Sequence, residues 1–116
     1  MLYGLGEQTI SKIRGVFAAH PSIEKTVLYG SRAKGNYKPG SDIDLTLYGD
    51  ALTSRELRDI VEELDDLLLP YQIDLSLFSQ IEHEGLKEHI ERVGVEFYRR
   101  EQSEISDLLA RIGGRQ

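Results

Sequence analysis

The chain of 116 residues contains no cysteine and no tryptophan, and it has only one methionine. Without cysteine there can be neither a disulfide framework nor a thiolate metal site. No apolar run approaches the ~20 residues that a membrane-spanning helix needs, so we expect no membrane span. The amino-terminal stretch MLYGLGEQTI lacks a basic region followed by a long apolar stretch, so we expect no secretory signal. These absences fit a cytoplasmic location.

Positive charge is also scarce. The chain has 14 lysine and arginine residues against 20 aspartate and glutamate residues, which gives a formal net charge of −6. Proteins that hold long nucleic acids by their overall field are normally basic, so we do not expect such a partner. A small anionic ligand that arrives with a divalent metal remains compatible with this charge, because the metal reverses the local sign.

The order of apolar and turn residues predicts one domain over residues 1–116, with residues 101–116 as a C-terminal helical tail. The sequence TSRE at 53–56 has the form of a capping box, with Thr53 as the cap and Glu56 reaching back. Expected helices cover about 10–17, 54–69, 81–93 and the segment from Ser103, and expected strands cover 26–29, 42–48, 71–78 and, as a short edge strand, 95–98. This order predicts an α/β fold with a small mixed β-sheet covered on one face by helices.

Three aspartates occupy the polar face of two alternating strands. Side chains in a strand alternate between faces, so Asp42 and Asp44 share the face opposite Ile43 and Leu45. Asp74 has the same place in the later strand, and one helix between the strands allows them to be parallel neighbours. We therefore expect a three-carboxylate cluster, whose repulsion a hard divalent cation such as Mg²⁺ would relieve. The alternative is an ordinary solvated strand face, and Asp74 and the preceding loop favour the metal site.

The loop before these aspartates has the composition of a phosphate-binding turn. Gly30 and Ser31 follow a strand directly, where glycine lets the backbone turn sharply and approach a ligand. Arg32 and Lys34 add positive charge where a triphosphate would lie, and Ser41 belongs to the return of the loop toward Asp42. An ordinary tight turn with solvated basic residues is the competing interpretation.

Together these residues resemble a known family. Gly30-Ser31, ten residues, Asp42-x-Asp44 and a later Asp74 are similar to the signature of the DNA polymerase β-like nucleotidyltransferase superfamily. The stretch GSRAKG…SDIDL is especially similar to the minimal nucleotidyltransferases, and the resemblance covers about residues 10 to 98. The commoner form of the loop is GSRARG, so Lys34 keeps the charge of the second arginine but lacks its bidentate fork.

The resemblance implies a reaction and its ligands. Asp42 and Asp44 would coordinate two Mg²⁺ ions, and Asp74 would coordinate the ion that activates an acceptor hydroxyl, which attacks the α-phosphorus of ATP. Some members are antitoxins that transfer AMP to a tyrosine of a HEPN-domain RNase toxin, so a HEPN-domain partner in a homo- or hetero-oligomer is the expected assembly. The residues implied in nucleotide binding are Gly30, Ser31, Arg32, Lys34 and Ser41.

Two other functions stay open. The protein could transfer a nucleotide to a small hydroxylated molecule, although the chain has no room for an additional acceptor-binding domain. It could instead be a non-catalytic module that binds nucleotide and blocks a partner sterically, because Ile105, Leu108, Leu109 and Ile112 form an apolar stripe that could be an interface. The same stripe could simply fold back on the core.

The remaining aromatic and histidine residues give weaker signals. We expect His83 and His89 to be surface residues, because their six-residue separation does not match the spacing of a zinc helix. Tyr48 or Phe78 could stack on a base, but packing is the default for aromatic residues in strands.

Overall fold

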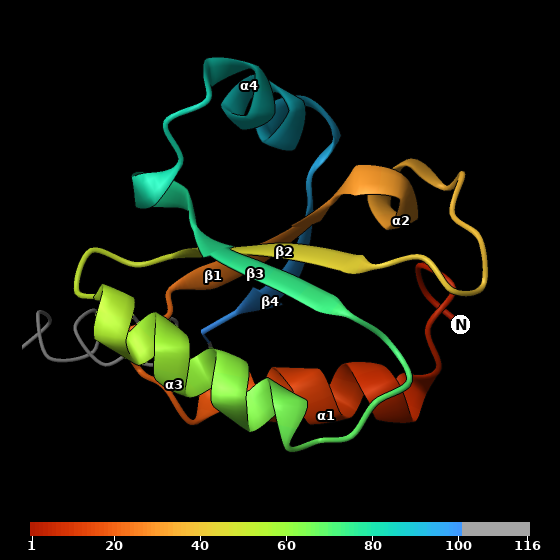
Figure 1. Ribbon diagram of the computed structural model, residues 1–116, viewed down its shortest axis with the longest axis horizontal. Coiled ribbons are helices and arrows are strands. Elements are labelled where there is room, and N and C mark those ends of the chain that lie inside the picture. Colours follow the sequence, from red (N-terminus) through yellow and green to blue (C-terminus); the bar gives the residue numbers. More distant parts are fainter. Residues whose placement is uncertain (101–116) are drawn as a thin grey trace, which may run out of the picture.

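The structure, a computed structural model, describes residues 1–100, so the predicted tail helix lies outside the described residues. Within residues 1–100, four strands and four helices alternate, with one short 3₁₀ helix (Figure 1). In chain order they are α1 (Glu7–Ala18), β1 (Lys25–Tyr29), α2 (Gly30–Lys34), β2 (Ile43–Tyr48), α3 (Ser54–Asp65), β3 (Ile73–Leu77), the 3₁₀ helix Phe78–Gln80, α4 (Glu84–Val93) and β4 (Val95–Arg99).

The strands form one mixed sheet in the order β3-β2-β1-β4. β1 pairs antiparallel with both β2 and β4, whereas β2 and β3 are parallel and are connected through α3. The predicted parallel pair and the predicted edge strand are therefore both confirmed. In the parallel pair Asp44 lies opposite Asp74, and Thr46 lies opposite Ser76.

The main hydrophobic core lies between the sheet and the helices α1 and α3, which cover the same face (Figure 1). Alternation turns Leu45 and Leu47 of β2 into this layer, where they meet Phe17 of α1 and Ile60 of α3. The predicted α/β fold with a small mixed sheet is confirmed, and α1 and α3 are the helices that cover this face. Within residues 1–100 no helix combines the length and the apolar character that a membrane crossing requires.

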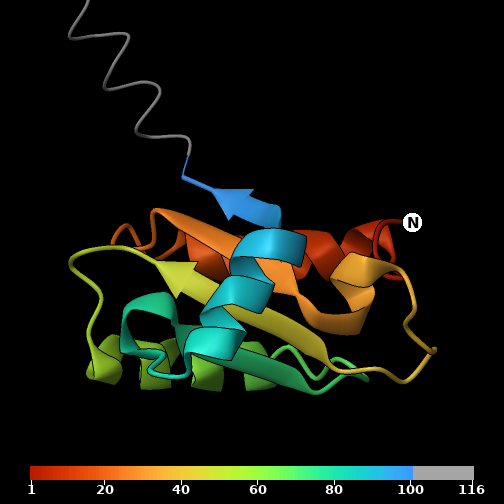
Figure 2. The ribbon, with the colours of Figure 1, turned by 90° about the horizontal axis from the view of Figure 1, so that it is seen from above.

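α4 adds a second, smaller layer on the opposite face. Seen from above, it lies across the strands, with β4 at one edge of the sheet (Figure 2). Ile90 of α4 is buried against Val27 and Tyr29. Tyr48 and Phe78 stack on each other with ring centroids 4.6 Å apart and belong to this layer, so they pack as aromatic strand residues commonly do.

Two details around α3 differ from the prediction. The helix ends at Asp65 rather than near Pro70, and Leu68 has a positive φ of 54° and is 87% exposed, because the chain turns there toward β3. Thr53 caps the helix by accepting a hydrogen bond from the Glu56 amide, as predicted. The Glu56 carboxylate does not complete the capping box, because its Oε2 pairs with His20 Nδ1 at 2.9 Å.

Candidate active site

The three predicted aspartates lie at one end of β2 and β3, on the face opposite α1 and α3. Asp44 and Asp74 are directly opposed in the parallel register, and Asp42 lies just before β2. Asp44 is partly buried, while Asp42 and Asp74 are exposed. The strand pairing therefore brings two carboxylates side by side and leaves the third at the entrance of the strand.

The environment of Asp44 opposes its ionisation. Burial, the charge of Asp74 and the charge of Asp42 all raise the pKa of Asp44, and His89 lowers it by a smaller amount. Among the described residues, the ion pairs join other groups and none of them includes these aspartates. Ionised carboxylates held together without a basic partner attract a cation.

The donor atoms of this site are of the type that Mg²⁺ binds. All three side chains offer carboxylate oxygens, the hard ligands that Mg²⁺ prefers. Within residues 1–100, no group of three or more His, Asp or Glu side chains is already gathered to hold a metal ion. Mg²⁺ normally takes one or two protein carboxylates and completes its shell with substrate phosphates and water, so the pair Asp44 and Asp74 with Asp42 nearby meets this requirement.

Gly30, at the start of the loop, packs closely against one of the carboxylates. It has a positive φ of 74°, and a Cβ atom added there would overlap Asp44 Oδ2. Only glycine allows the chain to turn from β1 into α2 so close to this carboxylate. The structure thus brings Gly30 and Asp44 together, and Ser31 follows in the first turn of α2.

Arg32 has a different role from the phosphate contact that the sequence suggested. Its side chain is 2% exposed, and it donates to the carbonyl oxygens of Ser41 at 2.8 and 3.1 Å, Tyr3 at 2.9 Å and Pro39 at 3.3 Å. Its guanidinium also lies 5.0 Å from the ring centroid of Tyr71. We therefore assign Arg32 to holding the loop between α2 and β2 in place, because a guanidinium enclosed by backbone carbonyls is not presented to a ligand.

The other two predicted loop residues, Ser41 and Lys34, have different surroundings. The Ser41 hydroxyl accepts a hydrogen bond from the Lys38 amide at 2.8 Å, so Ser41 closes the loop that Arg32 holds. Lys34 is exposed at the end of α2, where Gly35 ends the helix with a φ of 88°. Of the two basic residues predicted at the site, only Lys34 is exposed.

His89 and Tyr29 lie beside the site and were missed from the sequence. The His89 ring meets the Tyr29 ring edge-on, with centroids 6.2 Å apart. Burial and the charge of Asp74 raise the pKa of the Tyr29 hydroxyl, a hydrogen bond with Ser76 lowers it, and Asp44 adds to the rise. Positions 86, 89, 90 and 93 recur at helical spacing and form the inward face of α4. The helical spacing of the sequence could therefore have predicted that His89 faces inward.

His83, in contrast, is exposed as expected. It is the N-cap of α4, and its Nδ1 accepts a hydrogen bond from the Leu86 amide at 3.0 Å. The two histidines therefore have different surroundings, His83 at the start of α4 and His89 against Tyr29.

Comparison with known proteins identifies the class. Residues 11–103 match the family described as polymerase beta, nucleotidyltransferase, and the chain belongs to this family. The match spans the sheet, the Gly30 turn and all three aspartates. A comparison with curated protein sequences gave no significant match.

Solved structures share the fold at low sequence identity. One chain of a toxin–antitoxin complex with AMP-PNP is 21% identical with a TM-score of 0.63, and the match covers 97% of this chain and 88% of that chain. One chain of a complex of tri-AMPylated Shewanella oneidensis HEPN toxin with MNT antitoxin is 18% identical with a TM-score of 0.60, over 95% of this chain and 86% of that chain. One chain of the MntA–HepT toxin–antitoxin complex is 18% identical with a TM-score of 0.60, and the match covers 96% of this chain and 87% of that chain.

Proposed function

We propose that this protein is a Mg²⁺-dependent nucleotidyltransferase that transfers AMP from ATP to a hydroxyl group. The observation that carries the proposal is the register that sets Asp44 opposite Asp74, with Asp42 at the strand entrance and Gly30 against Asp44. Membership in the nucleotidyltransferase family supports it. An acidic, unpaired face beside a glycine turn is suited to a metal–triphosphate complex and not to a free anion.

In the proposed reaction an acceptor oxygen forms a bond to the α-phosphorus of ATP. The bond between the α-phosphorus and the oxygen that bridges to the β-phosphorus breaks, and pyrophosphate leaves. The proton of the acceptor hydroxyl passes to a neighbouring base, and Asp74, exposed beside Asp44, is assigned to the acceptor side. Gly30 and Ser31 bind the β- and γ-phosphates, with Lys34 as the nearby positive charge.

Asp42, Asp44 and Asp74 would hold the two Mg²⁺ ions. When bound, Mg²⁺ supplies positive charge that neutralises the phosphates and the charge that develops during transfer. Asp44 is suited to this task because burial and two neighbouring carboxylates already disfavour its charge, so a cation relieves an unfavourable interaction as it binds.

We infer that the acceptor is a tyrosine of a HEPN-domain toxin, for which this protein would be the antitoxin. The support comes from relatives of the same fold, one in a complex that contains AMP-PNP and another in a complex with a tri-AMPylated HEPN toxin. The described part of the chain has α4 on the carboxylate face of the sheet and no further acceptor-binding domain, which suits an acceptor supplied by another protein.

Intact-mass spectrometry tests this function. The protein is incubated with ATP and Mg²⁺, with and without the product of its adjacent gene. We expect the partner to gain the mass of one or more AMP groups, and Asp42→Ala and Asp44→Ala to abolish the gain. Asp59→Asn, at an exposed position of α3, is the matched control and should leave the gain unchanged. An unmodified partner in the wild-type reaction would contradict the proposed acceptor.

The same variants separate the two alternatives. If Asp42→Ala/Asp44→Ala still neutralises the toxin in cells as well as the wild type does, the protein acts as a steric inhibitor. If the partner stays unmodified while a small hydroxylated molecule consumes ATP, the acceptor is that molecule.

A further inference from the structure

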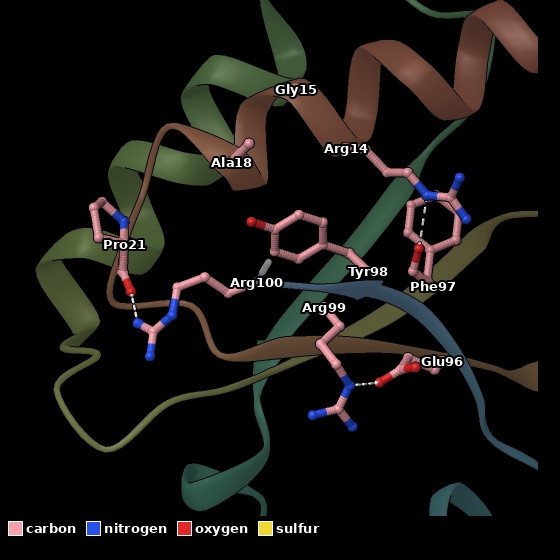
Figure 3. A pocket seen from close by; sticks show the side chains of 9 residues that line it. All are labelled: Arg14, Gly15, Ala18, Pro21, Glu96, Phe97, Tyr98, Arg99 and Arg100. Carbon is pink, nitrogen blue, oxygen red and sulfur yellow. Dashed lines mark hydrogen bonds and ion pairs between the residues drawn. The ribbon is translucent and has the colours of Figure 1, made fainter. Parts of the chain in front are cut away.

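A groove of about 630 Å³ lies between α1 and the edge strand β4 (Figure 3). It is on the side of the sheet that carries α1, so it is separate from the carboxylate face. Gly15 and Ala18 of α1 and Pro21 form one wall, and Phe97, Tyr98 and Arg100 form the other. Neither the family signature nor the proposed reaction uses these residues.

The floor of the groove is apolar and well supported. Phe97 is 1% exposed, and both Phe97 and Tyr98 pack on Phe17, with ring centroids 6.3 and 5.8 Å apart. The small residues Gly15 and Ala18 leave space above these rings. A well-packed floor beneath small wall residues is suited to apolar side chains from another segment.

The rim of the groove is basic in a chain whose net charge is −6. Among the described residues its lining carries the positive charges of Arg14, Arg99 and Arg100 and the negative charge of Glu96, which pairs with Arg99 at 2.5 Å. Arg14 Nε donates to the Phe97 carbonyl oxygen at 2.8 Å, and Arg100 donates to the Pro21 carbonyl oxygen, so both side chains are held in place. Figure 3 shows the Tyr98 ring turned toward α1, with Arg14 on one side and Arg100 on the other.

We propose that residues 101–116 of this chain dock in this groove. The described part of the chain ends at Arg100, which itself lines the groove, and consecutive Cα atoms are about 3.8 Å apart, so residue 101 begins beside it. The first half of the segment is complementary to the rim in charge, and the segment carries an apolar pattern. Its acidic residues are Glu101, Glu104 and Asp107, its basic residues Arg111 and Arg115 come later, and its apolar residues, at helical spacing, are Ile105, Leu108, Leu109 and Ile112.

Docking of this segment has two consequences. It covers the edge of the sheet at β4, and exposed strand edges otherwise pair with other chains. It also assigns the apolar stripe of the segment to this chain and not to a partner, and it leaves the carboxylate face open for nucleotide and acceptor. The groove is on a different surface from the carboxylates, so docking there and the proposed reaction are tested independently.

Disulfide trapping in the full-length chain tests the proposal, and the absence of native cysteine leaves no background. Ala18→Cys is combined in turn with Leu108→Cys and with Leu109→Cys, because a disulfide forms only when two Cα atoms come within about 4.4–6.8 Å of each other. Leu68→Cys, at an 87% exposed position between α3 and β3, replaces Ala18→Cys in the matched control. Circular dichroism verifies that each variant is folded.

We expect an intrachain disulfide with Ala18→Cys to form several-fold faster than with Leu68→Cys. Adding Glu104→Lys should slow trapping by up to about fivefold, the effect of losing one exposed ion pair. Equal trapping at both positions, the absence of any trapping with Ala18→Cys, or disulfides only between two chains would each overturn the proposal. The last result would make the groove an interface between copies of the chain.

Discussion

The protein alone disfavours a negative charge on Asp44, whereas the proposed reaction requires that charge to bind metal. Its pKa is raised by burial and by the charges of Asp74 and Asp42. A carboxyl whose folded-state pKa is raised binds its proton more tightly in the folded protein. Its contribution to stability therefore declines as pH rises from about 3.9, the ordinary aspartate value, and the deficit is complete once the pH has passed the folded-state pKa.

Asp44→Asn should therefore stabilise the metal-free protein at pH 7 while it abolishes nucleotidyl transfer. Because Asp44 is only partly buried and solvent screens its charge, the expected gain is modest, about 0.5 kcal/mol in the free energy of unfolding. Urea denaturation without Mg²⁺ measures it. A variant less stable than the wild type under these conditions would show that the carboxylate is satisfied in the absence of metal.

Gly30 is required for a different reason, the space beside Asp44. Gly30→Ala should destabilise the fold by about 2–4 kcal/mol, the sum of about 1 kcal/mol for a positive φ and about 1–3 kcal/mol for overpacking against Asp44 Oδ2. Gly35→Ala is the matched control, because Gly35 also has a positive φ but its added Cβ would meet nothing within 4 Å. Chemical denaturation of both variants gives the difference, and equal losses would mean that Gly30 is needed for its backbone conformation alone.

Between elements, His20 connects the end of α1 to α3. Its Nδ1 and Nε2 lie 2.9 Å from Glu56 Oε2 and 2.8 Å from Glu63 Oε2. Burial lowers the pKa of His20, but the hydrogen bonds and charges of these two glutamates outweigh burial and raise it overall. The protonated imidazole is thus the form that bridges both glutamates most favourably.

The connection between α1 and α3 should therefore weaken as the pH rises. The stabilisation is complete below about 6.5, the ordinary histidine pKa, and is lost as the pH passes through the raised folded-state value. We expect the free energy of unfolding of the wild type, relative to His20→Gln, to fall by up to about 1 kcal/mol between pH 6 and pH 8.5. Urea denaturation at several pH values measures this difference, and a difference independent of pH would contradict the assigned pairing.

At the same scale, local patterns predicted the elements but not every contact between them. Alternation in DIDLTLY and YQIDLSLF predicted two strands with aspartates on one face, and the helix between them predicted the parallel pairing. The same rules could not predict that Glu56 turns to His20, because that partner is 36 residues away in the chain. Arg32 was assigned to phosphate for a similar reason. Its carbonyl partners include Tyr3, which only the folded chain brings near.

In the molecule as a whole, one face of the sheet packs the main core and the other carries the candidate active site. One face is closed by α1 and α3 over the main core, and the other carries the carboxylates beside the smaller layer under α4 (Figure 1). Sequence periodicity was sufficient to find the core face, since it depends on alternation alone. It did not reveal that α4 crosses to the other face, because an amphipathic helix fits either side of a sheet, and His89 was missed with it.

Transfer of label from ATP tests the central claim most directly. The protein and its adjacent-gene partner are incubated with Mg²⁺ and ATP labelled at the α- or the γ-phosphate, with Asp44→Asn as the inactive control. A nucleotidyltransferase incorporates the α-label into the partner and releases the γ-label in pyrophosphate. Incorporation of the γ-label would indicate a phosphotransferase, and no incorporation of either label would contradict nucleotidyl transfer to this partner.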